Sequence, residues 1–462
     1  MNLSGVLSIG ANSLGAAQHG IQVTSQNIAN AETEGYTRRL AQFEPIPLDQ
    51  GGGVRANGSN RVQDQYLERR VLGGRSYDGE ASAKTETLGI LDAVFAEQNG
   101  SVGAALDAFD AAISDFATNP NSPANRNAVL SKAEDLSRAF SQTADALTQA
   151  RVDANGKITD SVRQVNQALE QIGELGGQIV AARINGNEAG DLEDRRDQLV
   201  REVAKYVPVN VIQGEHGAIT LQMANSRSLV DVDSKVHKLI AQPDAATGDV
   251  RIYRETVGQL EEVTQLITTG SIGGTIAARD GALATARTQL DQLASDVATA
   301  YNTQHAAGFG LDGGTSRNLF AVNPTLDGSA SNMAVSADVA GQPNFLAGAT
   351  DAANLPSDNR NALNLLHVRD MRIANSGTAT ALESFNAIVS SAGQSVQSAR
   401  NQATQASAVL AQVEALRASA SGVSTDEEMI NLMKFQRSYQ AGLRVVETAD
   451  QMLEELMNMV RR

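Results

Sequence analysis

The stretch NIANAETEGYTRR, from Asn27 to Arg39, follows a helix pattern that starts near the first residue. In that pattern, apolar or small side chains recur in alternating steps of four and three, as in the seam of a coiled coil. The seam consists of Leu3, Leu7, Gly10, Leu14, Ala17, Ile21, Thr24 and Ile28. Asn30, Thr33 and Gly35 then supply turn-forming residues, so the sequence predicts that the helix ends here.

The other end of the chain has the same design. Ser424 or Thr425 can cap a helix, and the acids that follow favour a helix N-terminus. The pattern beyond predicts a seam of Met429, Leu432, Gln436, Tyr439, Leu443, Val446, Asp450, Leu453, Met457 and Val460. A lone amphipathic helix is marginal in water, so we expect the two terminal helices to pair with each other.

More apolar side chains remain than this pairing can bury. Outside the predicted seams lie Ile430, Met433, Phe435, Val445, Met452, Leu456 and Met459 in the C-terminal helix, and Val6, Ile9 and Val23 in the N-terminal one. Exposed apolar area is a driving force for association, at roughly 25 cal/mol per Å². We therefore expect a third surface, supplied by another subunit or a chaperone. The alternative is that both helices fold back onto the middle of the chain.

Between its ends, the chain is predicted to be mainly α, elongated and multidomain, with a small antiparallel β subdomain. The predicted helical domain has a break after 118, a break or kink at Val152–Lys157 and a further break at Ile184–Asp191. Ser122 is expected to cap the helix that begins at Pro123. In chain order the predicted parts are an N-terminal axial helix (1–37), an extended connector (38–79), a helical domain (80–206, 270–305 and 378–422), a β-rich subdomain (207–269), a loop-rich region (306–377) and a C-terminal axial helix (423–462).

Composition excludes several classes of function. The 462 residues carry a net charge of −16, which disfavours binding to nucleic acid or to anionic lipid. No run of about 18 apolar residues occurs, so no membrane insertion is expected. With no Cys, the chain has neither disulfides nor thiolate metal sites. Aromatic residues make up only 4%, which suits long helices with thin seams better than an enzyme pocket.

The absence of Cys has two interpretations, chance in a reducing compartment or export of an unfolded chain that must avoid wrong disulfides. The first residues lack the basic region and apolar core of a Sec signal. Composition alone therefore predicts a cytoplasmic protein, or one exported by a route that leaves its signal uncleaved. Five of the nine Met lie between Met429 and Met459, which indicates either an adaptable partner surface or an ordinary helical core.

The chain contains few patterns typical of chemistry. GFGLDG, from Gly308 to Gly313, has the spacing of a dinucleotide-binding loop, but it follows a helix pattern and leads into loop, so we interpret it as a turn. The five His are scattered, and the Ca²⁺-like run from Asn185 to Asp191 has Ala189 at a ligand position. We expect no catalytic, cofactor or metal site. An enzyme that uses GFGLDG stays as the alternative from another functional class.

The two ends of the chain resemble a known family. SQNIANAETEGYTRR (25–39) resembles the N-terminal signature of bacterial flagellar axial proteins, which form rod, hook and hook-associated structures. GVSTDEEMINLMKFQRSYQAGLRVVETADQMLEELMNM (422–459) resembles their C-terminal signature. In the middle, NEAGDLEDRRDQLVREVAKYV (187–207) and the stretch from Ile276 to Gly314 are similar to the hook-associated proteins of the hook–filament junction. A rod or hook protein is the alternative, although their middles are mainly β.

The resemblance implies a structural protein of the extracellular flagellum, exported unfolded by the flagellar type III apparatus. It also implies that the terminal helices form the inner tube of the assembled structure, and that the outer domain is reduced here. The implied partners are the hook protein, the second junction protein, an export chaperone on the C-terminal helix, and copies of the chain in a ring. The predicted contact residues are Leu3, Leu7, Leu14, Ile21, Asn27, Ile28, Asn30, Gly35, Tyr36, Met429, Leu432, Phe435, Tyr439, Leu443, Val446, Leu453 and Leu456.

Overall fold

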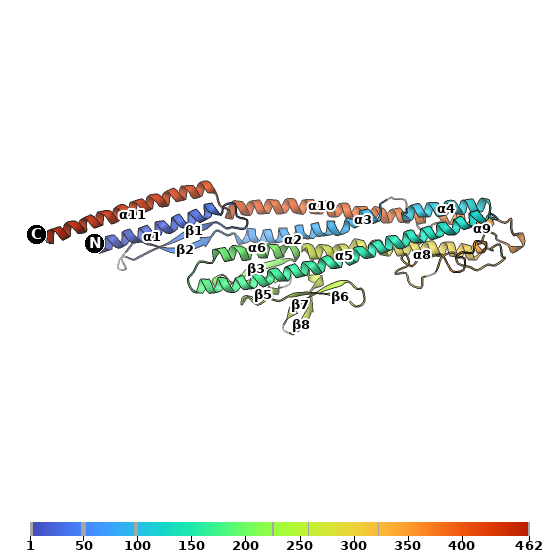
Figure 1. The fold of residues 1–462 in the computed structure, drawn as a ribbon, viewed down its shortest axis with the longest axis horizontal. Coiled ribbons are helices and arrows are strands. Elements are labelled where there is room, and N and C mark those ends of the chain that lie inside the picture. The colour runs from blue at the N-terminus through green and yellow to red at the C-terminus, as the bar shows by residue number, and fades with distance from the viewer. Residues whose placement is uncertain are drawn as a thin grey trace.

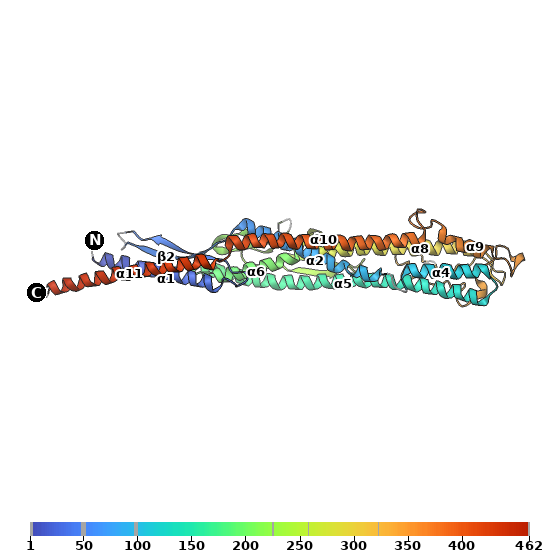
Figure 2. The ribbon, with the colours of Figure 1, turned by 90° about the horizontal axis from the view of Figure 1, so that it is seen from above.

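Two terminal helices extend from one end of a long rod, and a cluster of loops covers the other end (Figure 1). The structure is a computed structural model that describes residues 3–47, 52–96, 100–223, 226–256, 258–321 and 323–460. In both views the long helices run close to the long axis (Figures 1 and 2). This confirms the predicted mainly α, elongated fold with paired terminal helices.

The N-terminal segment is a helix followed by a hairpin. Helix α1 (Leu3–Ala29) lies beside α11 (Thr425–Val460), and strands β1 (Arg39–Pro45) and β2 (Val54–Arg61) pair antiparallel next to α1. The predicted extended connector over 38–79 is therefore wrong beyond its first part, since helix α2 already begins at Gln65. The side chain of Asp64 caps that helix. It accepts hydrogen bonds from the backbone amides of Tyr66 and Leu67, at 2.8 and 3.2 Å.

The middle of the rod is a bundle of helices. In chain order they are α2 (Gln65–Leu88), α3 (Ile90–Val94), α4 (Val102–Thr118), α5 (Pro123–Ile184), α6 (Gly190–Tyr206), α7 (Gly270–Ala278), α8 (Ala284–Ala306), α9 (Arg360–His367) and α10 (Ala381–Ser421). A π-helical turn (Arg279–Leu283) joins α7 to α8. Ser122 caps α5 as predicted, with its Oγ accepting from the amide of Asn125 at 3.3 Å.

Helix α5 runs for 62 residues without the predicted break at Val152–Lys157. The prediction was wrong because Gly156 costs a helix only about 1 kcal/mol, and the buried face continues past it through Ala154 and Ile158. Asn155 is also used by the fold, since its Oδ1 accepts from the amide of Val250 at 3.0 Å. A single helix thereby spans both hydrophobic cores of the rod.

The β subdomain consists of two small antiparallel sheets packed along α5. One contains β3 (Val209–Gln213), β4 (Ile219–Met223) and β5 (Arg227–Val230), and the other contains β6 (Leu239–Pro243), β7 (Val250–Thr256) and β8 (Gln259–Glu262). Their inward side chains form one core with the second half of α5, α6 and α7. The other core lies between α4, the first half of α5, α8, α10 and the loops around Phe320 and Leu346.

Candidate functional site

The two terminal helices approach each other closely through glycine. A Cβ added at Gly10 would lie 2.7 Å from Val446 Cγ2, and one added at Gly20 would lie 2.6 Å from the ring of Phe435. A Cβ would overlap these partner atoms at such distances, so the helices can approach this closely only because both positions are glycine. Of the predicted N-terminal contact residues, Leu3, Leu7, Leu14, Ile21 and Ile28 are all half-buried along this helix.

The seam predicted for α11 is correct at some positions and wrong by one residue at others. The buried and half-buried positions of the helix are Glu428, Asn431, Leu432, Phe435, Tyr439, Gly442, Val446 and Ala449. Without Asn431 they alternate in steps of four and three, so Phe435, Gly442 and Ala449 replace the predicted Gln436, Leu443 and Asp450. The observed register is physically better because no polar side chain interrupts it between Leu432 and Ala449 except the hydroxyl of Tyr439.

The hairpin covers part of α1 that was expected to need another subunit. Val23 is only 3% exposed, and Asn12 Nδ2 donates to the carbonyl of Gly52 at 3.0 Å. On the same side, His19 Nε2 lies 3.0 Å from the carbonyl of Gly58. For α1, the expected third surface is thus supplied largely by the chain itself.

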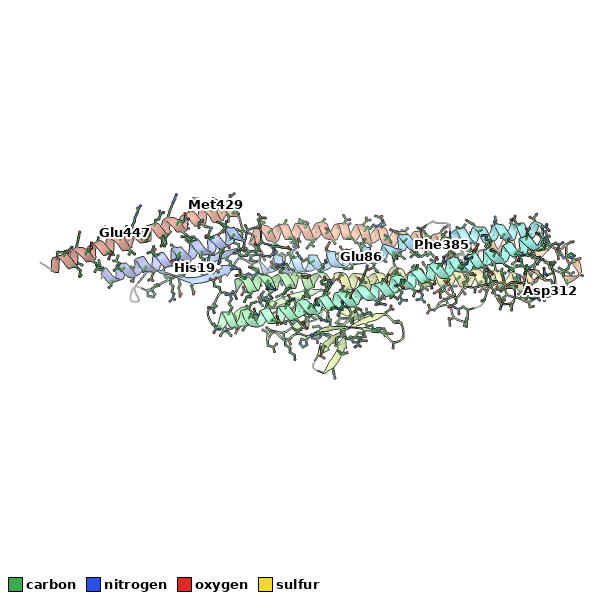
Figure 3. The ribbon with its side chains drawn as sticks, viewed as in Figure 1. His19, Glu86, Asp312, Phe385, Met429 and Glu447 are labelled. Carbon is green, nitrogen blue, oxygen red and sulfur yellow. The ribbon has the colours of Figure 1, made fainter. Side chains whose placement is uncertain are left out.

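Among the described residues, helix α11 has no such cover, either on the side opposite α1 or over its last turns. Its exposed large apolar side chains, between 36% and 67% exposed, are Met429, Ile430, Met433, Leu443, Val445, Met452, Leu453, Leu456, Met457 and Met459. Every side chain described from Asp450 to Met459 is exposed. Met429 and Glu447 mark this helix in Figure 3, where it extends beyond the middle bundle. Most of these side chains lie in two groups, at 429–433 and 452–459, and exposed apolar surface of this extent is a site for association.

The turn that ends α1 is organised around Asn27, which is fully buried. Its Nδ2 donates to the carbonyl of Arg39 at 2.8 Å and to Glu428 Oε2 at 2.9 Å. Its Oδ1 accepts from the amide of Arg39 at 3.0 Å and from the hydroxyl of Tyr36 at 2.9 Å. All four hydrogen-bonding positions of the amide are therefore occupied.

Glu428 connects this turn to the start of α11. It is 2% exposed, and its Oε1 accepts from Arg38 Nε at 2.9 Å and pairs with Nη2 of the same residue at 2.8 Å. The amide of Arg38 also donates to the carbonyl of Ser421 at 3.1 Å. The two ends of the chain are thus joined by a buried polar contact as well as by apolar packing. Asn30 and Gly35 lie beside it, Gly35 with a φ of +84°.

Two arginines of the hairpin hold it to the acidic face of α6. Arg39 pairs with Asp191 at 2.5 Å and Asp194 at 3.2 Å, and Arg61 pairs with Asp194 at 2.8 Å and Asp197 at 2.7 Å. Burial works against the charged form of Asp197, but the charges of Arg196 and Arg61 outweigh it and lower its pKa. Burial likewise opposes the charge on Arg61, yet its three carboxylate neighbours raise its pKa.

A second ionic contact joins α2, α6 and α10 at the same level of the rod. Glu68 accepts from Arg417 and, at 3.4 Å, from Arg201. We call the residues Asn27, Tyr36, Arg38, Arg39, Arg61, Glu68, Asp191, Asp194, Asp197, Arg201, Arg417 and Glu428 the polar joint. Of these, only Asn27 and Tyr36 were predicted contact residues. The sequence signal for the others is charge complementarity, since the turn ends in Arg38–Arg39 while α6 and the start of α11 are acidic.

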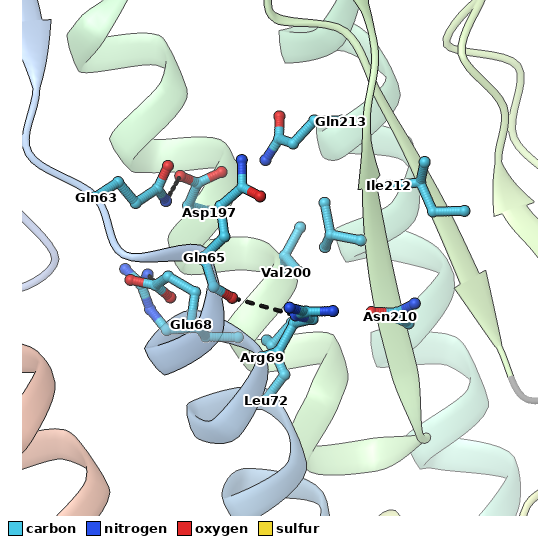
Figure 4. Close-up of a pocket in the computed structure, with 12 residues that line it drawn as sticks. Gln63, Gln65, Glu68, Arg69, Leu72, Asp197, Val200, Asn210, Ile212 and Gln213 are labelled. Carbon is cyan, nitrogen blue, oxygen red and sulfur yellow. Dashed lines mark hydrogen bonds and ion pairs between the residues drawn. The ribbon is translucent and has the colours of Figure 1, made fainter.

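A groove of about 390 Å³ borders the polar joint between α2, α6 and β3 (Figure 4). Its wall includes Glu68 and Asp197, whose charges are paired within the joint, and Gln63 donates to Asp197 at 3.1 Å. Arg69 crosses the middle of the groove and donates to the carbonyl of Gln65 at 3.4 Å. The carboxylates of the groove thus serve the joint, and nothing in the arrangement of its polar groups points to a reaction.

GFGLDG forms a turn, as predicted. It follows α8, and a Cβ at Gly308 would lie 2.1 Å from Asn361 Nδ2, so this glycine is needed for packing. Asp312 accepts from Arg317 at 2.9 Å and caps the turn. Within the described ranges there is no cluster of three metal-binding side chains. Among the same residues, no helix has the length and apolar content needed to cross a membrane.

Comparison with known proteins gives consistent matches. The family described as "Flagellar hook-associated protein FlgK helical domain" matches residues 88–320, and "Flagellar basal body rod FlgEFG protein C-terminal" matches 417–459. Flagellar hook-associated protein 1 of Salmonella typhimurium is 28% identical over 556 aligned positions, which cover 99% of this chain and 100% of the relative. The protein of the same name from Bacillus subtilis is 26% identical, with 96% of each chain covered.

A solved structure has the same fold. The flagellar hook junction protein FlgK from Burkholderia pseudomallei matches with a TM-score of 0.69 and 15% identity, covering 76% of this chain and 100% of that one. The alignment to the Salmonella relative has 556 positions against the 462 residues of this chain, so that relative contains segments without a counterpart here.

Proposed function

The chain belongs to the flagellar hook-associated protein FlgK family, and from this membership we propose how it joins the hook of the bacterial flagellum to the filament. It is a structural component of the hook–filament junction. In the proposed mechanism the chain polymerises through its paired terminal helices. The polar joint holds that pair at a fixed angle to the rod while neighbours bind its uncovered side.

The exposed apolar side of α11 carries this proposal. Ten large apolar side chains of α11 are at least 36% exposed, which is more apolar surface than a monomer usually leaves in water, and the partner helix α1 is already covered on two sides. The predicted contacts Met429, Leu443, Leu453 and Leu456 lie on exposed parts of α11. Leu432, Phe435, Tyr439 and Val446 instead support the pairing with α1.

Several finer points belong to the same proposal. The chain leaves the cell unfolded through the flagellar type III apparatus without a cleaved signal, and an export chaperone covers α11 until then. Its neighbours are copies of itself in a ring, the hook protein on one side and the second junction protein on the other. The absence of Cys supports export in the unfolded state. We also propose that the protein has no catalytic activity and that its loop-rich region, 306–377, is a reduced outer domain.

A rod or hook role is the second candidate, because the C-terminal match at 417–459 is to rod proteins. The helical middle and the match over 88–320 favour the junction. The two roles differ in what a deletion removes.

The test is deletion of the gene in its own bacterium, followed by electron microscopy. A junction protein should leave complete hooks without filaments, and the full chain should restore them. Loss of the hook itself would indicate a rod or hook role. Hooks that carry normal filaments would contradict both.

A second experiment tests the assembly surface. The triple variant Ile430→Ser, Met433→Ser, Met457→Ser should keep the helix content and melting temperature of the monomer but fail to restore filaments. The matched control is Val152→Ser with Leu363→Ser, since these apolar side chains are 55% and 49% exposed but lie on α5 and α9, away from the terminal helices. Restoration by the triple variant would show that the outer side of α11 is not needed.

A further inference from the structure

The charges of the terminal helix pair all lie on α11, and beyond the acids of its first turn they are separated by sign along the helix. Helix α1 contains no Asp, Glu, Lys or Arg. On α11, three exposed basic residues, Lys434, Arg437 and Arg444, are followed by four exposed acids, Glu447, Asp450, Glu454 and Glu455. The described part of the hairpin offers no free counter-charge, because Glu44 and Arg55 pair with each other at 3.1 Å while Arg39 and Arg61 pair with α6.

None of these seven α11 side chains forms an ion pair within the described part of the chain. Like charges are therefore grouped in two bands without internal neutralisation. Such a separation is unfavourable along one helix but complementary between two helices that are displaced along their axes.

Each charged band lies next to exposed apolar side chains of α11. On the side of α11 opposite α1, a groove of about 420 Å³ is lined by Ile430, Met433, Lys434, Arg437, Ser438 and Ala441. Its lining combines the apolar side chains of Ile430 and Met433 with the positive charges of Lys434 and Arg437. We call it the basic groove.

The acidic band likewise combines exposed apolar side chains with charge, here of the opposite sign. We call Asp450–Met459 the tail of α11, and all of its described side chains are exposed. On the face that would continue the seam with α1 it carries Leu453 and Met457, 36% and 67% exposed, with Asp450 and Glu454 beside them. The tail is thus an apolar ridge with an acidic edge, and Figures 1 and 2 show it extending past the start of α1.

We propose that the basic groove binds the acidic tail of a second copy of this chain. The proposal rests on the proposed function, since it specifies the contact through which copies polymerise. Leu453 and Met457 pack on Ile430 and Met433, while Asp450 and Glu454 face Lys434 and Arg437. Met433 and Leu453 are separated by about 30 Å along the helix, at about 1.5 Å per residue, so neighbouring parallel copies are offset by that distance.

The geometry of this contact suits an axial structure. Groove and tail are different patches, so each copy keeps one of them free after binding a neighbour through the other. Contacts of this heterologous kind continue into rings or helical arrays instead of closing as dimers. A surface that bound only a chaperone would not need a complementary patch on the same helix.

Cysteine cross-linking in isolated flagella tests the contact. The chain has no Cys, so only introduced thiols can form disulfides. The variant Met433→Cys, Met457→Cys, oxidised with copper phenanthroline, should give a ladder of multimers of this chain on non-reducing gels. The control Val152→Cys, Met457→Cys should stay monomeric. A link to a protein of another size, or no link while both thiols remain reactive, would overturn the proposal.

Charge reversal gives a second readout that does not depend on oxidation. Reversal of the groove (Lys434→Glu, Arg437→Glu) or of the tail (Asp450→Lys, Glu454→Lys) should each lower the fraction of hooks with filaments about tenfold, because like charges then meet. Both reversals in one chain should restore it. The contact would be contradicted if either reversal alone gave as many filaments as the unmodified chain, or if the combined reversal restored none. A deletion strain with normal filaments would instead contradict the proposed function, whatever the cross-linking shows.

Discussion

Asn27 shows how much one side chain contributes to the connection of the two chain ends. It makes four hydrogen bonds while fully buried, and one of them reaches Glu428, 401 residues away in sequence. A buried amide with every position satisfied specifies a single arrangement, because any other leaves polar groups without partners. The contact between turn and α11 is therefore specific as well as stabilising.

Asn27→Ala should lower the free energy of unfolding of the terminal segment by about 2–3 kcal/mol, since it leaves Glu428 and the hydroxyl of Tyr36 short of a partner. Hydrogen exchange of the α1 and α11 amides measures this. Asn30→Ala is the control, because Asn30 bonds only within its own turn, to Gln26 and Thr33. Equal protection in both variants would contradict the assigned role of Asn27.

His305 gives the distal end of the rod a dependence on pH. It is 1% exposed, its Nε2 accepts from the amide of Ala347 at 3.0 Å, and its Nδ1 must then donate to the carbonyl of Arg317 at 2.7 Å. Burial lowers the pKa of His305 below its ordinary value of 6.5, and the charges of Arg317 and Arg126 act in the same direction, against the hydrogen bond to the Arg317 carbonyl and the charge of Asp338. The unfolded chain therefore binds this proton more readily than the folded one.

By linkage, His305 stabilises the fold fully above pH 6.5, and this contribution falls as the pH drops below that value towards the folded pKa. Asp110 has the opposite effect, because burial raises its pKa to about 6. The effect of His305 is therefore measured as a difference between two proteins that both contain Asp110. The melting temperature of wild type minus that of His305→Gln should decrease between pH 7.5 and pH 5. A difference independent of pH would exclude His305 as the titrating group.

At the scale of elements, α11 shows that sequence periodicity predicts a helix with an apolar seam but not the register of that seam. Seams at 429, 436, 443 and 450 or at 428, 435, 442 and 449 have the same spacing, so periodicity does not distinguish them. The partner decides, because Gly10 and Gly20 of α1 admit Val446 and Phe435 closely. Burial of Glu428 also requires Arg38 and Asn27, which no local pattern in α11 reveals.

Glycine has opposite roles in two helices of the bundle. A Cβ at Gly274 in α7 would lie 2.1 Å from the carbonyl oxygen of Glu80 in α2, whereas Gly156 in α5 has nothing within 4 Å. Gly274→Ala should therefore destabilise the protein by about 1–3 kcal/mol through overpacking. Gly156→Ala should stabilise it by up to about 1 kcal/mol. Urea unfolding measures both, and equal signs would contradict the close packing of α2 on α7.

At the scale of the whole molecule, the polar joint fixes the direction of the terminal pair relative to the rod. Arg61 holds three carboxylates of α6, so Arg61→Ala leaves buried charges uncompensated, which costs about 3–5 kcal/mol for a buried pair. Small-angle X-ray scattering should then show a broader distribution of long distances. Arg55→Ala on the same strand is the control, since the Arg55–Glu44 pair is exposed. Unchanged scattering from Arg61→Ala would show that the joint does not set the angle.

The sequence predicted the overall shape better than the joint. Long helices, paired ends and a small β subdomain follow from periodicity and turn residues. The joint does not, because its residues come from α2, α6, α10, α11 and the hairpin, and their charges become neighbours only in the folded rod. Arg38 and Arg39 are recognisable in the sequence as a charged pair. Only the folded geometry shows that, among the many acids of the chain, Glu428 and Asp194 are their partners.

The central claim, that the terminal helix pair builds the junction, is tested most directly by cryo-electron microscopy of isolated flagella at the boundary of hook and filament. The account predicts a layer of this chain with α1 and α11 at the inner radius, the outer side of α11 covered by neighbouring copies, and the loops of 306–377 away from the axis. A layer whose terminal helices point outward, with the exposed side of α11 uncovered, would contradict it.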